Sequence, residues 1–213
     1  MTNHSAGVGG RRLDWPLVDD LFTTLLAALR SGATLGHPTE TVYGLGAEAS
    51  EEGVRRLRKL KGGFDTRPFV VLVGDDWHRS GLVVAPPLGI HLARIYWPGP
   101  LTMVLPPGPR APSALIGPTG GIAVRHSSHE VARDIATELQ WGLLSTSANR
   151  PGASPNAQPI PIEWPGSPDF WIDQAASGEQ PSTLVTLVES EPRTLRDGPI
   201  CIDWTSLGES TSI

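Results

Sequence analysis

The spacing of apolar side chains near the N-terminus predicts an amphipathic helix. Leucines recur every four residues between positions 17 and 29, and Gly32 ends the run. Asp14 is expected to cap this helix, with Pro16 in its first turn. Residues 1–13 lack such a pattern, and we expect them to form a flexible tail.

Short apolar runs further along the chain predict the strands of a sheet. The run FVVLV at 69–73 is apolar at every position, as in a strand that is covered on both faces. Polar helices are expected at 51–61 and from Ser127 or Ser128 to about Gln140. The other expected strands start at residue 33 and cover residues 102–105, 122–125, 143–145, 170–173 and 184–188.

Two segments are rich in residues that interrupt regular structure. In GHPTETVYGLG, residues 36–46, one proline and three glycines are expected to break any helix or strand. Residues 150–168 are rich in proline and are expected to form a long loop. The interleaved strands and helices indicate a single α+β domain with a mixed sheet over residues 14–205, followed by a C-terminal tail at 206–213.

Composition narrows the class of protein. The chain has 213 residues with 24 Gly and 21 Pro, which argues against a helical bundle and against a disordered chain. The single cysteine, Cys201, excludes an internal disulfide and favours a reducing compartment. No window approaches the roughly 18 consecutive apolar residues that a membrane span needs. We therefore expect a cytoplasmic protein with no membrane partner.

Charge is distributed unevenly along the chain. The net charge is −5, yet residues 55–67 contain six basic residues and one acidic residue. Such a basic patch suits a small polyanion such as a nucleotide, or one face of an RNA. The more common alternative is a helix face that contacts only water. Helical periodicity places Lys61 between Val54 and Leu57, so its side chain is expected to face a cleft or to lie along apolar surface.

Polar side chains in two further motifs are candidates for binding a small polar ligand. GHPTETVYGLG combines hydroxyls, a carboxylate and an imidazole with glycines that let a ligand approach the main chain, although turn chemistry is an alternative. In STSANRPG, Ser147 and Asn149 share one face of an extended segment. No glycines flank Ser147 as in the GxSxG nucleophile elbow, so ligand binding is preferred to nucleophilic catalysis.

Arg125 ends a predicted strand and suits a bidentate hold on a carboxylate, with a surface salt bridge as the alternative. The HSSH spacing after it raises the question of a metal site. Because no other His or Cys is clustered with His126 and His129, helix-capping and surface positions are favoured for both. The Walker motif and a GxGxxG that opens a helix are absent, so a nucleotide site needs another architecture.

An ordered series of motifs resembles the YrdC family of threonylcarbamoyl-adenylate synthases. The motifs are PTETVYGLG, KGGFDTRPFVVLV, WPGPLTMVL, GIAVRHSSH, STSANRPGASP, PSTLV and TLRDG, and they extend from about Ala33 to Ile200. The resemblance implies an α+β fold with a twisted mixed sheet around a concave, positively charged cavity. It also implies a nucleotidyltransferase that makes threonylcarbamoyl-AMP and pyrophosphate from L-threonine, bicarbonate and ATP. The product feeds threonylcarbamoyladenosine formation in tRNA through a separate transferase, and contact with double-stranded RNA is a further expectation.

The resemblance also implies which residues bind the substrates. The positions at which the family holds threonine are occupied by Thr41, Arg125, Ser147 and Ser182. The positions at which it holds ATP are occupied by Lys61, Arg67, Asn149 and Arg196. The same cavity motif contains Thr39 and Tyr43. Mg²⁺ is expected to arrive with ATP, without a metal site on the protein.

One departure from the family pattern concerns the phosphate-binding segment. The family usually has Lys-x-Arg where this chain has Lys61-Gly62-Gly63, so Gly63 replaces an arginine. Either Arg67 compensates for it, or activity is reduced or redirected. One alternative is therefore a YrdC-like paralogue that binds nucleotide or RNA through helix 55–61 without synthase activity. Another is a domain that uses carbamoyl phosphate, as in hydrogenase-maturation proteins, but the zinc-finger and acylphosphatase segments usual there are absent.

Overall fold

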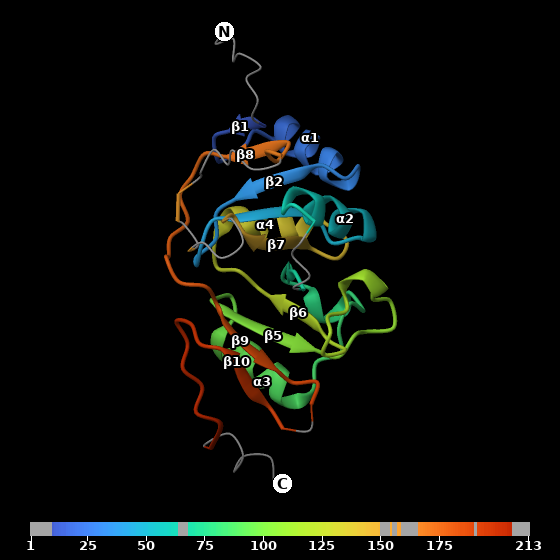
Figure 1. The fold of residues 1–213 in the computed structure, drawn as a ribbon, viewed down its shortest axis with the longest axis vertical. Coiled ribbons are helices and arrows are strands. Elements are labelled where there is room, and N and C mark those ends of the chain that lie inside the picture. Colours follow the sequence, from blue (N-terminus) through green and yellow to red (C-terminus); the bar gives the residue numbers. More distant parts are fainter. Residues whose placement is uncertain are drawn as a thin grey trace.

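A ten-stranded mixed sheet forms the centre of the computed structural model, which describes residues 10–63, 68–149, 154, 157–158, 166–189 and 191–205 (Figure 1). The strands lie in the order β1-β8-β2-β3-β7-β4-β6-β5-β9-β10. Their bounds are β1 Arg11–Leu13, β2 Thr34–His37, β3 Gly44–Glu48, β4 Val70–Leu72, β5 Leu101–Leu105, β6 Ile122–Arg125, β7 Leu143–Ser147, β8 Phe170–Ile172, β9 Thr183–Thr186 and β10 Arg193–Arg196. The α-helices are α1 Asp19–Arg30, α2 Glu51–Leu60, α3 Pro87–Tyr96 and α4 Glu130–Glu138. Two short 3-10 helices are η1 Trp77–Arg79 and η2 Ser113–Leu115.

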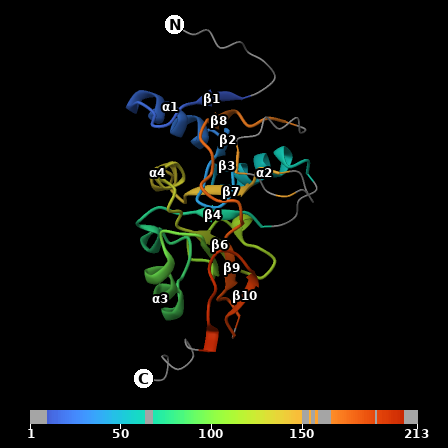
Figure 2. The same cartoon turned by 90° about the vertical axis from the view of Figure 1, so that its left-hand side faces the viewer.

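Helices cover both faces of this sheet. Helices α1 and α4 lie on the opposite side of it from α2 (Figure 2). One cluster of buried apolar side chains contains Leu25 of α1, and a second contains Leu57 of α2 and Leu92 of α3. Val71 belongs to the second cluster and its neighbour Leu72 to the first. This alternation confirms that the apolar run of β4 is covered on both faces.

Strand β4 joins two halves of the sheet through few residue pairs. It pairs antiparallel with β7 at three positions, Val70 to Leu72, and parallel with β6 at only two, Val71 and Leu72. β2, β3 and β7 lie on one side of it, and β6, β5 and β9 lie on the other. The β2–β3 connection, residues 38–43, and Arg125 of β6 therefore come from different halves.

Local sequence signals explain where α2 begins and ends. At its start, the Ser50 side chain accepts a hydrogen bond from the backbone nitrogen of Gly53 at 3.1 Å, as a capping serine does. At its end, Gly62 and Gly63 have φ of 83° and 78°, a conformation that favours glycine. Their nitrogens donate to the carbonyls of Lys59 and Arg58, which forms a Schellman motif and stops the helix.

The structure corrects the expectations for the N-terminal region. Residues Arg11–Leu13 were expected in a flexible tail but form β1, which pairs in parallel with β8. A three-residue strand whose partner lies far along the chain leaves little local signal. Helix α1 starts at Asp19 with Val18 at its N-cap, so the expected cap by Asp14 is wrong. Residues 1–9 lie outside the described residues, as do 206–213 and most of the loop 150–168.

Further corrections concern elements in the middle and C-terminal parts of the chain. The segment 36–46 is not irregular throughout, because β2 reaches His37 and β3 starts at Gly44. Helix α4 has His129 at its N-cap, so neither Ser127 nor Ser128 begins it. The sequence analysis predicts neither α3 nor β10. None of the described helices combines the length and the hydropathy that a membrane crossing requires.

Candidate active site

The β2–β3 connection is a tight, buried turn that presents threonine hydroxyls. Thr39 and Thr41 are almost fully buried, and their Oγ1 atoms are 2.8 Å apart. Thr39 Oγ1 donates to the carbonyl of Val42 at 2.7 Å. Thr39 therefore holds the turn together, while Thr41 makes a contact with the opposite half of the sheet.

That contact is made with Arg125, at the end of β6. Its side chain is buried, and Nη1 donates to Thr41 Oγ1 at 3.0 Å. Nε lies 3.6 Å from Oε1 of Glu40. Burial lowers the pKa of Arg125, and the Glu40 carboxylate opposes this shift. A guanidinium group keeps its charge in proteins. Arg125 is thus a buried cation rather than one half of a surface salt bridge.

Ser182, just before β9, is joined to Arg196 of β10 and to Thr102 of β5. Its Oγ lies 2.7 Å from Thr102 Oγ1, and both residues are buried. Arg196 donates to the carbonyl of Ser182 through Nε at 3.1 Å and Nη2 at 2.9 Å, and to Oγ at 3.2 Å. A residue expected to bind threonine and one expected to bind ATP are therefore in direct contact.

Lys61 faces the body of the protein, as its position on the helix predicts. It is 1% exposed, and its Nζ donates to the carbonyls of Ser147 at 3.0 Å and Asn149 at 2.7 Å. The structure therefore brings the ammonium group to the end of β7, where the STSAN motif lies. Gly44 of β3 pairs with Ser147, which connects this group to the β2–β3 connection.

Tyr43 belongs to the core rather than to this polar group. Its hydroxyl donates to the carbonyl of Ile172 in β8 at 2.6 Å, and its ring stacks on Trp171 at 5.9 Å. Burial, together with the charge of Asp173, raises the pKa of the phenol above its ordinary value. Tyr43 therefore anchors the β2–β3 connection to β8, the neighbour of β2 in the sheet.

His37 is fully buried against two glycines of β3. A Cβ atom at Gly44 or Gly46 would come within 2.9 Å or 3.0 Å of its ring, so both positions require glycine. Its Nδ1 lies 3.2 Å from the Pro38 carbonyl, and its Nε2 lies 3.3 Å from Ser145 Oγ. Burial lowers the pKa of His37 to about 3, so the imidazole is neutral near pH 7.

The two histidines of HSSH were expected on the surface, but both are buried. His126 and His129 are 7% and 8% exposed, and no side-chain capping bond is made by His129 at the start of α4. Burial lowers the pKa of both. Within the described part of the chain, no three His, Cys, Asp or Glu side chains come together as a metal site would need.

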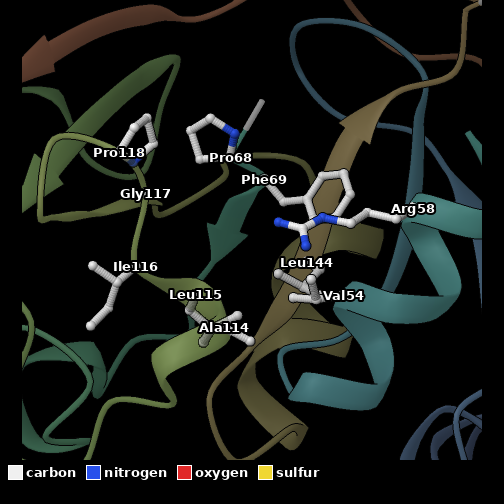
Figure 3. Close-up of a pocket in the computed structure, with 10 residues that line it drawn as sticks. All are labelled: Val54, Arg58, Pro68, Phe69, Ala114, Leu115, Ile116, Gly117, Pro118 and Leu144. Carbon is white, nitrogen blue, oxygen red and sulfur yellow. The ribbon is translucent and has the colours of Figure 1, made fainter. Parts of the chain in front are cut away.

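The basic helix is only partly available to an external ligand. Arg55 pairs with Glu52 on the same helix, and Arg56 pairs with Asp169 at 3.1 Å. Both are surface pairs that contribute little stability. Arg58 instead lines a pocket between α2 and the segment after η2 (Figure 3). Arg67 lies outside the described residues, so its expected role stays a prediction.

Most of the residues that line the pocket beside α2 are of apolar types. Figure 3 shows Arg58 reaching from the helix toward Phe69, with Val54 and Leu144 below them. The rest of the lining consists of Pro68, Ala114, Leu115, Ile116, Gly117 and Pro118. Arg58 brings a charged group among these apolar neighbours.

No individual ligand-binding role was predicted for three residues of this region, Glu40, Thr102 and Ser127, although Ser127 was considered as a helix cap. Ser127 Oγ donates to Glu40 Oε2 and accepts from the backbone nitrogen of His129 at 3.2 Å. A signal was present for Thr102, because it is a polar residue inside the apolar strand LTMVL. For Glu40, the sequence indicated only that it is one of several polar residues in GHPTETVYGLG.

The chain is similar in sequence and in fold to other proteins. A family model named Sua5_yciO_yrdC and described as telomere recombination matches residues 27–198. A threonylcarbamoyl-AMP synthase of Methylococcus capsulatus is 37% identical over 136 residues, 62% of this chain and 73% of that protein. A putative threonylcarbamoyl-AMP synthase of Mycobacterium leprae is 34% identical over 188 residues, 83% of this chain and 82% of that protein.

A solved structure agrees with these sequence relatives. The crystal structure of Pyrococcus abyssi Sua5 complexed with L-threonine matches with a TM-score of 0.74 at 29% identity, over 88% of this chain and 57% of that one. The α+β fold with a twisted mixed sheet is thereby confirmed. The family match covers most of the chain, and its named relatives agree with it. The chain belongs to the Sua5/YciO/YrdC family.

Proposed function

We infer that this chain is an L-threonylcarbamoyl-AMP synthase, a nucleotidyltransferase that joins L-threonine, bicarbonate and ATP and releases pyrophosphate. The observation that carries this function is the buried contact of Arg125 with Thr41 at 3.0 Å, which holds a cation among hydroxyl groups. Relatives named threonylcarbamoyl-AMP synthase support the same activity. They do not favour a paralogue that only binds nucleotide or RNA.

Threonine binds at the meeting point of the two halves of the sheet. Arg125 takes its carboxylate, since a guanidinium matches a carboxylate with two parallel hydrogen bonds. The hydroxyls of Thr41, Ser147 and Ser182 supply the neutral hydrogen bonds. The L-threonine complex of the Pyrococcus abyssi protein supports a threonine site on this fold.

ATP binds beside the threonine. Lys61, Arg67, Asn149 and Arg196 hold the nucleotide. Mg²⁺ enters bound to the triphosphate and neutralises part of its charge.

The chemistry requires positioning and charge neutralisation rather than a covalent enzyme intermediate. The α-ammonium group of threonine loses a proton to solvent, and the amine that results reacts with bicarbonate to form a carbamate and water. A carbamate oxygen then attacks the α-phosphorus of ATP, and the bond from that phosphorus to the pyrophosphate oxygen breaks. Buried cations and hydroxyls hold the reacting groups and the developing charge.

The product is passed on in the cytoplasm to a separate transferase that modifies tRNA. The exposed residues of the basic helix, among them Lys59, are the surface we assign to contact with RNA, including double-stranded RNA.

The test is pyrophosphate release from ATP by the full chain, with and without L-threonine and bicarbonate. We expect release that depends on both co-substrates, with threonylcarbamoyl-AMP identified by mass. ATP binding without such release would favour the paralogue. Release that requires carbamoyl phosphate instead would favour the domain type of hydrogenase-maturation proteins.

A further inference from the structure

Glu40 is a buried carboxylate in the β2–β3 connection to which no role has yet been given. Its side chain is 11% exposed. Ser127 Oγ donates to one of its oxygens, Oε2. The other oxygen, Oε1, is shielded from solvent and receives no hydrogen bond from any described residue. Because a buried carboxylate oxygen without a donor is costly, an unmet acceptor inside a binding site suggests that a ligand supplies the donor.

A donor on Arg125 is unmet at the same place. Its Nε lies 3.6 Å from Glu40 Oε1, which is too far for a hydrogen bond, and it reaches no other acceptor among the described residues. Nη1 of the same guanidinium is occupied by Thr41 Oγ1. A cation and an anion thus lie side by side, and the bonding capacity of each is only partly used.

We propose that Glu40 binds the α-ammonium group of threonine while Arg125 binds the α-carboxylate, an inference that rests on the proposed function. An α-amino acid carries both charges on a single carbon. A complementary site therefore needs a carboxylate and a guanidinium next to each other, as Glu40 and Arg125 are. Glu40 then determines specificity, because a ligand of the same shape without the ammonium leaves the buried carboxylate unpaired.

A carboxylate that only holds Arg125 in place would behave differently. It would affect every ligand that carries a carboxylate, whether or not an amino group is present. Two ligands separate these roles: L-threonine, and (R)-3-hydroxybutanoate, which is threonine without its amino group. Arg125 can serve both ligands, whereas Glu40 can serve only the first.

The experiment measures both affinities by calorimetry on the full chain and on the variant Glu40→Gln. In the parent, we expect threonine to bind at least about 30-fold more tightly than 3-hydroxybutanoate. In Glu40→Gln, we expect threonine affinity to fall by about 10-fold or more, the usual size for a lost hydrogen bond between charged groups. The affinity for 3-hydroxybutanoate should stay within twofold of the parent value.

Glu40→Asp keeps the charge but shortens its reach, so it should show intermediate discrimination. Glu138→Gln, at the exposed end of α4, is the matched control and should behave as the parent does. Equal losses for both ligands in Glu40→Gln, or no loss for threonine, would overturn the proposal. So would a parent that binds the two ligands equally, a result that does not depend on the variant folding.

Pyrophosphate release by the parent separates the two levels of inference. Threonine-dependent release without ligand discrimination leaves the synthase function intact and removes the role of Glu40. A parent that neither binds threonine nor releases pyrophosphate overturns the function, and the role of Glu40 with it.

Discussion

Arg125 is a charged side chain that burial would make unfavourable without nearby partners. Thr41 and Glu40 supply them, at 3.0 Å and 3.6 Å. In Arg125→Ala, we expect the binding free energy of threonine to weaken by about 2–5 kcal/mol, because a buried charged hydrogen bond is lost. Calorimetry measures this loss, and exposed Arg94→Ala on α3 is the control. Threonine affinity within twofold of the parent would contradict the role of Arg125.

Removing Arg125 also leaves Glu40 as a buried charge without its counterion. Breaking a buried ion pair in this way typically costs about 3–5 kcal/mol of folding free energy. Affinity must therefore be measured at a temperature where the variant is shown by circular dichroism to be folded.

The variant Ser147→Ala tests whether the reaction proceeds through a covalent enzyme intermediate. If the Ser147 hydroxyl only orients a substrate, Ser147→Ala loses about 0.5–1.5 kcal/mol of transition-state stabilisation and remains active. A covalent nucleophile would lose several orders of magnitude in rate. Intact-mass measurement during turnover provides an independent check, and an adduct on Ser147 would refute direct attack by the carbamate.

His37 gives the protein a pH-dependent stability with a defined sign. Burial keeps its folded-state pKa at about 3, whereas the unfolded chain protonates it below an ordinary value of 6.5. Between these values the unfolded state binds the additional proton, so the free energy of unfolding falls as the pH falls from about 6.5 toward 3.

His37→Phe removes this titration and keeps an aromatic ring. We expect the fall in unfolding free energy between pH 6.5 and 3 to become shallower by up to about 1.4 kcal/mol per pH unit. Urea titrations at several pH values provide the measurement, and exposed His91→Asn is the control. An unchanged slope in His37→Phe would show that the folded protein protonates His37 readily.

At the scale of elements, Gly63 at the end of α2 has two properties. Its backbone conformation favours glycine, and it stands where the family usually has a phosphate-binding arginine. Gly63 has φ of 78°, and a Cβ there would meet no atom within 4 Å. Gly63→Arg therefore costs about 1–2 kcal/mol of folding free energy through its backbone without a steric clash. We expect its affinity for ATP to equal or exceed that of the parent, because a phosphate-binding cation is restored.

Gly63→Ala separates the two effects, since it carries the same backbone cost without the charge. Arg67→Ala tests whether Arg67 compensates for the missing arginine, and it should weaken ATP binding strongly. Normal ATP binding by Arg67→Ala would show that Gly63 is not compensated at that position. Equilibrium binding of a non-hydrolysable ATP analogue measures all three variants.

Elements with a local signal were predicted well, and those that depend on distant partners were not. The periodicity of α2, its serine cap and its two terminal glycines are all present within a few residues. The strand at 122–125 has the predicted bounds. In contrast, β1 exists because β8 lies beside it, and the ring of His37 leaves no room for a Cβ at Gly44 or Gly46 of β3. Such tertiary contacts leave no pattern in a short window of sequence.

At the scale of the whole molecule, the candidate site is assembled from both halves of the sheet. Sequence motifs identified many of its side chains because each motif carries its own chemistry. They could not show that Thr41 meets Arg125 across β4, or that Tyr43 turns toward β8 instead. The pairing of Glu40 with Arg125 was likewise hidden, since the two residues are far apart in the sequence and only folding brings them together.

The bonds from Arg196 to Ser182 have a thermodynamic consequence. Arg196 is assigned to ATP and Ser182 to threonine. A substrate bound at one of these residues therefore also fixes the residue that serves the other substrate. We expect each substrate to tighten the other by the same factor, about 5–150-fold, as linkage requires. Calorimetry with threonine and a non-hydrolysable ATP analogue measures this factor, and it should shrink in Arg196→Lys.

An unchanged factor in Arg196→Lys would show that the two sites fill independently. With reciprocal coupling of this kind, the enzyme holds each substrate most tightly when the other is also bound. At low threonine, ATP then binds more weakly, so less of it is held for the reaction.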